Sequence, residues 1–280
     1  MWKNNLENIL NKKIISVQNV GGGCIADSQI VKTENGEKYF VKKYSNSKIN
    51  LAEANGLNEI AKSKAIRVPK VIFVNDEFLI LEFIDSKSKA KYFSDTFGRQ
   101  FAKMHKFTAD KFGFFEDNFC GSNHQKNLPK NENWIEFYFE NRLKFQFKLA
   151  EKNGFANLEL RKEFFNIEKN ISKIFDGSEN LPSLLHGDLW NGNIISDEKG
   201  NPCLIDPAVY YGNREADLAM TKLFGGFDFE FYNAYNEEFP LVENWQYREN
   251  IYKLYHVFNH LNLFGMGYFS QTLSLMKSYK

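Results

Sequence analysis

The chain changes character about a third of the way along, and this change limits the folds that it can adopt. Its first third consists of short apolar segments separated by turn residues, with one long segment of helical periodicity. Strands are predicted at 14–20, 25–33, 38–44, 71–74 and 77–83. Helices are predicted at 2–10 and 47–62. These elements indicate a small antiparallel sheet that carries one helix between its third and fourth strands.

Beyond residue 84 the sequence is mainly helical, because apolar residues recur there at three- and four-residue spacing. Helices are predicted at 94–107, 133–152, 158–175, 214–224, 229–235, 245–264 and 268–278. A β-rich stretch at 184–206 interrupts them, and the Gly-, Asn- and Asp-rich segment 111–131 predicts a long loop. We therefore expect an α+β chain of two lobes, a β-rich lobe at 1–83 and a larger, mainly helical lobe at 84–280.

Charge and composition exclude several classes of protein. The 36 basic and 35 acidic residues are mixed along the chain and give a formal net charge of +1, which argues against nucleic acid or an anionic membrane as the main partner. No apolar run resembles a signal peptide or approaches the roughly 20 residues of a membrane-spanning helix. Cys24, Cys120 and Cys203 form neither a CxxC pattern nor a disulfide framework. We expect a cytoplasmic protein, either a monomer or a homodimer.

The most informative segment is His186-Gly187-Asp188-Leu189-Trp190-Asn191-Gly192-Asn193, which is followed by Leu204-Ile205-Asp206-Pro207. Transfer of a γ-phosphoryl group requires a carboxylate that orients the attacking hydroxyl and accepts its proton. It also requires oxygen ligands for Mg²⁺. The pattern predicts Asp188 as the catalytic carboxylate, and Asn193 and Asp206 as the magnesium ligands. An ordinary turn or cap would explain any one of these residues but not the joint pattern.

This segment resembles the protein-kinase catalytic loop, H-R-D-L-x-x-x-N, with its downstream D-F-G motif. Gly187 stands in place of the arginine and Pro207 in place of the phenylalanine, and no A-P-E follows. The form H-G-D-x-x-x-x-N is instead typical of aminoglycoside phosphotransferases and choline kinases. The arginine that would pair with a phosphorylated activation loop is missing, and Pro207 has a fixed φ and no N–H. We therefore expect a protein-kinase-like fold with a permanently formed site for a small molecule.

Two residues near this loop are predicted to support it. His186 precedes the catalytic carboxylate by two positions and can hydrogen-bond to the backbone near Asp206, which favours a structural role over proton transfer. Asp217 lies near the start of a predicted helix, where an acid can act simply as a helix N-terminal charge. In related kinases an acid at this place anchors the backbone of the catalytic loop, and that role is the one we expect.

The first lobe carries the candidates for ATP binding. The turn Gly21-Gly22-Gly23-Cys24 can bring backbone N–H groups close to phosphate, although an ordinary hairpin turn would look the same. Lys42 occupies the third-strand position of the V-A-I-K type of motif and is predicted to contact the α- and β-phosphates, whereas Lys43 should face the other way. Glu53 on the following helix is the expected partner of Lys42, ahead of Glu59.

The segment 79–84, which includes Glu82 and Ile84, is the predicted connection between the lobes. Its backbone would hydrogen-bond to adenine. A buried apolar strand is a second interpretation of the same residues, and the two can hold together.

Four segments together resemble the fructosamine-3-kinase (ketosamine-3-kinase) family: 21–25, 186–193, 206–212 (Asp-Pro-Ala-Val-Tyr-Tyr-Gly) and 223–227 (Leu-Phe-Gly-Gly-Phe). The resemblance implies an ATP- and Mg²⁺-dependent enzyme that phosphorylates the 3-hydroxyl of ketosamines, either small glycated amines or glycated protein lysines, for deglycation repair. Trp190, Tyr210 and Tyr211 would then contact the sugar; a packing role is the alternative for each of them. An aminoglycoside- or choline-type kinase and a catalytically inactive nucleotide-binding module are the alternatives.

Two further features have competing explanations. His256 and His260 are four residues apart on a predicted helix and could bind a metal, but the pattern includes no nearby acid or cysteine, so packing is favoured. Cys24 lies in the glycine turn, where its thiol is either a redox-sensitive group or a small packing residue.

Overall fold

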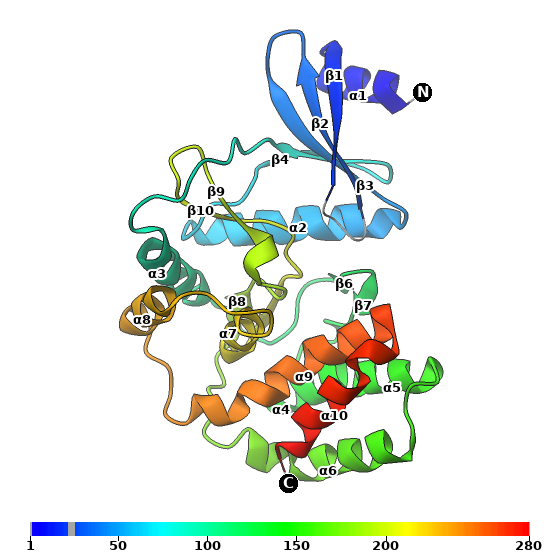
Figure 1. The fold of residues 1–280 in the computed structure, drawn as a ribbon, viewed down its shortest axis with the longest axis vertical. Helices are drawn as coiled ribbons and strands as arrows, with labels where there is room; N and C mark the ends of the chain where they lie inside the picture. The colour runs from blue at the N-terminus through cyan, green and yellow to red at the C-terminus, as the bar shows by residue number, and fades with distance from the viewer. Residues whose placement is uncertain (1, 22–25, 280) are drawn as a thin grey trace.

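The computed structural model describes residues 2–21 and 26–279. Its first part is a five-stranded antiparallel sheet in the order β1-β2-β3-β5-β4. The strands are β1 (Ile14–Val20), β2 (Ala26–Thr33), β3 (Lys38–Tyr44), β4 (Val71–Val74) and β5 (Leu79–Glu82). The helices of this part are α1 (Trp2–Leu10) and α2 (Ser47–Ser63). The sheet and its single crossing helix lie at the top of Figure 1 and agree with the pattern expected from the sequence.

Strand alternation decides which lysine of β3 faces inward. Lys42 is 4% exposed, whereas Lys43 is exposed, as the period-two alternation of a strand requires. Lys42 pairs in register with Ser28 of β2 and Leu79 of β5, so it lies in the central strand of the sheet. A separate small core that includes Leu6 of α1 packs under the same sheet.

The remaining chain is mainly helical (Figure 1). Most of its buried apolar residues belong to one large core, which also includes residues of α2 and β5. Its longer helices are α3 (Phe93–His105), α5 (Phe145–Lys152), α6 (Leu158–Ile174), α8 (Phe229–Glu238), α9 (Trp245–Phe264) and α10 (Phe269–Lys277). Its shorter ones are α4 (Trp134–Tyr138), α7 (Glu215–Thr221), a π-helix (Phe139–Lys144) and two 3₁₀ turns (Asn191–Asn193 and Met266–Tyr268). The predicted helix 133–152 is thus continuous, but it contains a π-helical turn between α4 and α5.

Among these helices, the described residues form three short antiparallel strand pairs. They are β6 (Asn118–Cys120) with β7 (Asn123–Gln125), β8 (Ser183–Leu185) with β11 (Tyr210–Gly212), and β9 (Ile194–Ser196) with β10 (Pro202–Leu204). The first pair corrects the sequence analysis, which expected only a loop at 111–131. Strands of three residues are too short to show the alternation of apolar and polar residues by which a strand is predicted. Side-chain hydrogen bonds, such as that from Gln125 Nε2 to Asn118 Oδ1 (2.8 Å), hold this pair in place.

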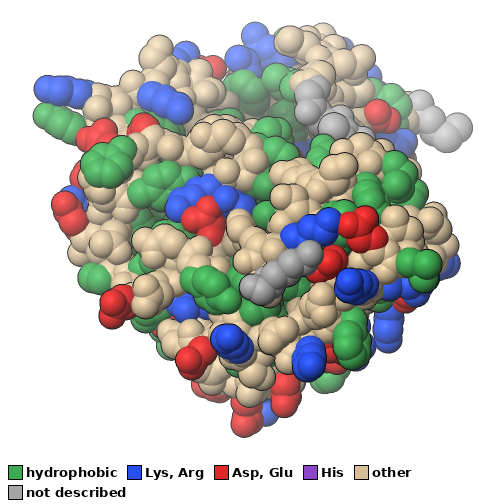
Figure 2. All heavy atoms as spheres, turned by 60° about the horizontal axis from the view of Figure 1, so that its bottom comes forward, with side chains coloured by type: hydrophobic (Ala, Val, Ile, Leu, Met, Phe, Trp, Pro, Cys, Tyr) green, Lys and Arg blue, Asp and Glu red, His purple; other side chains and the backbone are tan. Residues whose placement is uncertain are grey.

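On the face shown in Figure 2, basic and acidic side chains of the described residues are interspersed, as their mixing along the sequence suggests. Among the helices of the described residues, none is both long and apolar enough to cross a membrane.

The close packing of α3 on α8 depends on a glycine. A Cβ built on Gly98 would lie 2.3 Å from the carbonyl oxygen of Phe231 and 2.9 Å from the backbone nitrogen of Tyr235. These neighbours are backbone atoms of a packed helix, so they can move only if the two helices separate. Gly98 therefore sets the distance between α3 and α8.

We predict that Gly98→Ala lowers the free energy of unfolding by about 1–3 kcal/mol, because the added methyl group overpacks this contact. Urea denaturation measures the change. Gly267→Ala is the matched control, since no atom lies within 4 Å of the Cβ position there and the expected change is within about 0.5 kcal/mol. Equal effects of the two substitutions would contradict the assignment.

Candidate active site

The loop between β8 and β9 carries Asp188, and Asp217 of α7 holds this loop by its backbone. The Asp217 carboxylate accepts hydrogen bonds from the backbone N–H of His186 (2.6 Å) and of Gly187 (2.8 Å). Asp217 is 1% exposed and also lies 3.3 Å from Nε2 of buried His105. Burial alone would raise the pKa of Asp217, but the neighbouring histidines and the Gly187 N–H outweigh it and keep that pKa below its usual value. The expected anchoring contact is therefore present.

Gly187 explains why the arginine of the protein-kinase pattern has no room here. Its φ is +81°, a left-handed conformation that glycine adopts without strain. A Cβ on Gly187 would lie 2.0 Å from the carbonyl oxygen of Ala208. The loop thus passes directly against the segment that follows Asp206, and only a residue without a side chain fits between them.

His186 connects the same two segments through its ring. Its Nε2–H donates to the carbonyl oxygen of Ile205 (2.9 Å), and its Nδ1 accepts from the backbone N–H of Asp188 (3.3 Å). Complete burial lowers the pKa of His186, so the ring is neutral at physiological pH and can both donate and accept. The structure therefore places His186 as a bridge between the Asp188 loop and the residue before Asp206.

Lys42 lies between two carboxylates from different parts of the chain. Its Nζ is 2.7 Å from Oε1 of Glu53 on α2 and also contacts Oδ1 of Asp206. The alternative partner, Glu59, instead accepts a hydrogen bond from the Tyr211 hydroxyl (2.7 Å). Burial alone would lower the pKa of Lys42, but Glu53 and Asp206 raise it well above its usual value, so Lys42 stays charged.

Two oxygen-bearing side chains near Asp188 and Lys42 are suited to a magnesium ion. Asp206 has a φ of +55° and a half-exposed side chain. Asn193 is buried, and its Nδ2 donates to the carbonyl oxygen of Asp188 (2.8 Å), which orients the amide. The Asn193 amide oxygen and the Asp206 carboxylate are hard oxygen donors of the kind that Mg²⁺ prefers, so the donor set fits this ion.

Asp188 itself is partly buried and close to other acids. Burial, together with the carboxylates of Asp206 and Asp217, raises the pKa of Asp188 to about 7. A carboxyl group with this pKa can accept a proton near neutral pH and release it again. The arrangement of Lys42, Glu53, Asp188, Asn193 and Asp206 is suited to phosphoryl transfer.

Comparison with known proteins agrees with this geometry. A model of the fructosamine kinase family matches residues 2–280. The chain is 39% identical over 278 residues to the chloroplastic protein-ribulosamine 3-kinase of Oryza sativa subsp. indica, an alignment that covers 95% of this chain and 79% of the other. This chain belongs to the fructosamine kinase family.

Solved structures extend the comparison to the fold. A Thermobifida fusca protein assigned as a fructosamine-3-kinase superposes with a TM-score of 0.88 at 29% identity, covering 99% of this chain and 97% of the other. A choline kinase from Streptococcus pneumoniae gives a TM-score of 0.67 at 18% identity over 99% and 98% of the two chains. This chain therefore has the protein-kinase-like fold that its sequence predicts.

The three aromatic residues predicted to contact a sugar lie in different environments. Trp190 is 39% exposed next to Asp188, and its ring meets Phe224 edge to face at 5.9 Å. Tyr210 is 2% exposed and packs against the guanidinium of Arg142, 4.0 Å from the ring centre. Tyr211 is 8% exposed, and its hydroxyl donates a hydrogen bond to Glu59. The structure thus favours the packing alternative for both tyrosines and leaves Trp190 as the accessible ring.

The predicted nucleotide contacts are only partly described. Gly21 is exposed at the end of β1, whereas Gly22, Gly23 and Cys24 lie outside the described residues. The backbone N–H of Glu82 donates to the carbonyl oxygen of Lys70 (2.9 Å), and its side chain pairs with Arg67 (2.9 Å). Ile84 is buried. The backbone N–H of Glu82 is therefore used within the first lobe, and adenine binding by the backbone of 79–84 stays a prediction.

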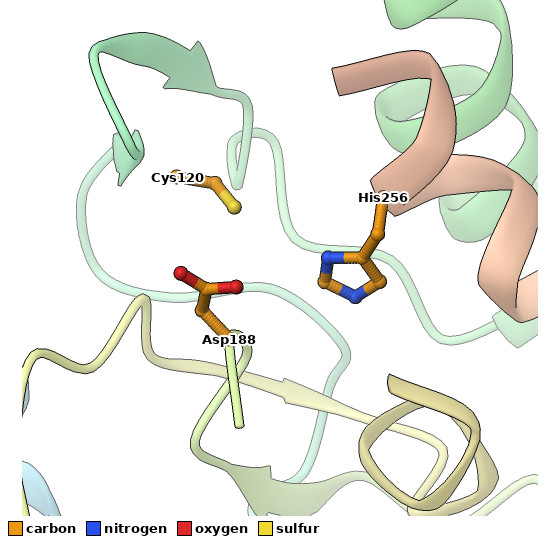
Figure 3. Close-up of side chains that lie close together, drawn as sticks. All are labelled: Cys120, Asp188 and His256. Carbon is orange, nitrogen blue, oxygen red and sulfur yellow. The ribbon is translucent and has the colours of Figure 1, made fainter. Parts of the chain in front are cut away.

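The sequence offered His256 only as a possible metal ligand together with His260, and it did not place His256 or Cys120 beside Asp188. Cys120 of β6 and His256 of α9 point toward the Asp188 carboxylate (Figure 3). Buried amides fix the β6–β7 pair beside the segment that follows Asp206, since Asn118 donates to Val209 O (2.7 Å) and Gln125 to Ala208 O (2.9 Å). The concentration of Asn and Gln at 118–127 was the available signal, because such residues are buried when they bind backbone.

We predict that the Asp188 carboxyl in the metal- and nucleotide-free protein titrates with a midpoint near pH 7. This pKa is raised above the unfolded value of about 4, so the folded protein holds a proton between these pH values that the unfolded chain has lost. The stability that this group contributes is fully present below about pH 4 and is lost as the pH rises through 7. Carboxylate ¹³C NMR measures the midpoint, with Asp188→Asn to assign the resonance.

Added Mg²⁺ should lower this midpoint, because a nearby cation favours the charged carboxylate. A midpoint near pH 4 in the free protein would contradict the described surroundings of Asp188.

Proposed function

We propose that this chain is an ATP-dependent kinase that phosphorylates the 3-hydroxyl of ketosamines, such as ribulosamines, erythrulosamines or fructosamines. The single observation that carries the proposal is the convergence of Lys42, Glu53, Asp188, Asn193 and Asp206 in a member of the fructosamine kinase family. The protein-ribulosamine 3-kinase to which the chain is similar supports the substrate class. Phosphorylated ketosamines decompose and release the amine, so the role would be deglycation repair.

In this proposal one lobe binds ATP and the other binds the acceptor. Residues 1–83 bind ATP, with Lys42 on the α- and β-phosphates and the glycine turn at 21–24 over the phosphate chain. Residues 84–280 hold the acceptor and supply Asp188. The Asn193 amide oxygen and the Asp206 carboxylate would hold Mg²⁺, which would neutralise the charge that develops on the phosphates.

The reaction follows from the position of Asp188. Its carboxylate accepts a hydrogen bond from the acceptor hydroxyl and takes the proton as the oxygen attacks the γ-phosphorus. A bond forms between the acceptor oxygen and the γ-phosphorus, and the bond to the β–γ bridging oxygen breaks, releasing ADP. The raised pKa of Asp188 suits a group that must take up this proton and then lose it to solvent.

Trp190 is proposed to cover the sugar. It is the exposed aromatic ring beside Asp188, and an apolar ring face can stack on the C–H face of a sugar. Gly192 permits this position, because a Cβ there would lie 2.4 Å from the Trp190 ring. The edge-to-face contact with Phe224, which itself meets His260 at 5.2 Å, continues the aromatic surface toward α9.

We predict that Asp188→Asn lowers kcat for a ribulosamine by about 100-fold to 10,000-fold while ATP binding is retained. The amide preserves the shape of the side chain but cannot accept the proton. Steady-state kinetics with a panel of ribulose-, erythrulose- and fructose-derived amines measures the loss, and a fluorescent ATP analogue reports nucleotide binding.

Asp176→Asn is the control, because Asp176 is an exposed aspartate outside the loop at 186–193. Full activity of Asp188→Asn would disprove the mechanism. Phosphorylation of choline or an aminoglycoside, with none of any ketosamine, would favour the alternative kinase type. Nucleotide binding without any transfer would indicate an inactive module.

A further inference from the structure

Three side chains with metal-binding atoms meet beside the catalytic loop (Figure 3). They are Cys120 at the end of β6, Asp188, and His256 in the middle of α9. One sulfur, one carboxylate oxygen and one ring nitrogen of these residues all lie within 4.8 Å of one another. The three residues come from segments separated by 68 positions in sequence, since 188 − 120 = 68 and 256 − 188 = 68. Only the fold brings them together.

The histidine of this group has an unused nitrogen. His256 is 3% exposed, and its buried Nδ1 has no hydrogen-bond partner among the described residues. A buried polar atom without a partner is costly, so such an atom in a native structure usually indicates a ligand, an ion or water. Burial also lowers the pKa of His256 to about 3, which keeps the ring neutral and able to donate a lone pair.

Neighbouring hydrogen bonds hold the group in position. Asn259, one turn beyond His256 on α9, donates to the carbonyl oxygen of Cys120 (3.1 Å) and accepts from Nδ2 of Asn123 (2.8 Å). Tyr255 of α9 donates to Gln125 of β7 (2.7 Å). The helix and the β6–β7 pair are therefore joined on both sides of the Cys120–His256 contact, which is the kind of surrounding support that a metal site requires.

The donor set distinguishes this group from the proposed magnesium ligands. A thiolate, an imidazole and a carboxylate together suit Zn²⁺, whereas Mg²⁺ prefers oxygen donors such as those of Asn193 and Asp206. Zinc binds these three donor types at about 2.0–2.3 Å, so small side-chain rotations must bring the atoms closer. A water molecule would complete a tetrahedral site.

We propose that Cys120, Asp188 and His256 form a binding site for Zn²⁺, and that zinc bound there inhibits the kinase by taking the Asp188 carboxylate as a ligand. The thiol loses its proton to solvent when the metal–sulfur bond forms. Burial and Asp188 raise the pKa of Cys120, and a cation at this place reverses that effect. Zinc binding is independent of the proposed reaction, whereas the inhibition rests on the proposed role of Asp188.

The binding is tested with Co²⁺ as a spectroscopic substitute for zinc, added to the full chain without nucleotide or Mg²⁺. We expect one Co²⁺ per chain and a near-ultraviolet thiolate-to-cobalt band. The band should disappear in Cys120→Ser, and the affinity should fall at least tenfold in His256→Ala and in the less disruptive His256→Gln. Zn²⁺ should displace the cobalt.

Cys203→Ala and Cys24→Ser are the matched controls, because they remove the other two thiols and should leave the band unchanged. Circular dichroism verifies that each variant is folded. Absence of the band, or its persistence in folded Cys120→Ser, would overturn the site.

Activity supplies a second measurement at saturating Mg-ATP. Zn²⁺ should inhibit competitively with the ketosamine, a chelator should restore activity, and Cys120→Ser should require at least tenfold more zinc for the same inhibition. Cobalt binding without inhibition by zinc would disprove the inhibitory role. If no ketosamine is phosphorylated even without zinc, the proposed function fails, and the cobalt titration still decides whether the site exists.

Discussion

The buried ammonium group of Lys42 is the constraint on which the site depends. A charge removed from water is stable only when opposite charges surround it, and here they come from Glu53 of α2 and from Asp206 beyond β10. One lysine therefore joins the central strand of the sheet, the helix that crosses the sheet and the aspartate of the helical part. Lys42 and Glu53 both have side chains that are 5% exposed. Removing one partner of such a buried pair typically costs about 3–5 kcal/mol, since it leaves the other charge uncompensated.

The loop that carries Asp188 is also held by a few specific contacts, but these contacts involve its backbone. Asp217 binds two consecutive N–H groups, His186 bridges to Ile205, and Gly187 allows the loop to touch Ala208. None of these contacts requires a phosphorylated segment or a mobile arginine. The loop is therefore held in position by permanent neighbours, which suits an enzyme for small molecules more than a regulated protein kinase.

The sequence predicted those features that depend on local spacing. Patterns within short segments predicted the sheet strands and the longer helices. They also predicted the Lys42–Glu53 pairing and the loop from His186 to Asn193. The β6–β7 pair was missed because three-residue strands show no period. Tyr210 and Tyr211 follow Asp206 closely in sequence, but β11 pairs with β8 and both side chains are buried. Cys120 and His256 could not be placed beside Asp188 because only tertiary packing joins three segments so far apart.

The most direct test of the account is the position of the phosphate in the product. The protein is incubated with Mg-ATP and a ribulosamine of lysine, and ³¹P–¹H correlation NMR identifies the carbon that carries the new phosphate. We predict a phosphate on O3 of the sugar, formed by the wild-type protein and absent with Asp188→Asn. Phosphate on another hydroxyl, or equal product from the variant, would contradict it.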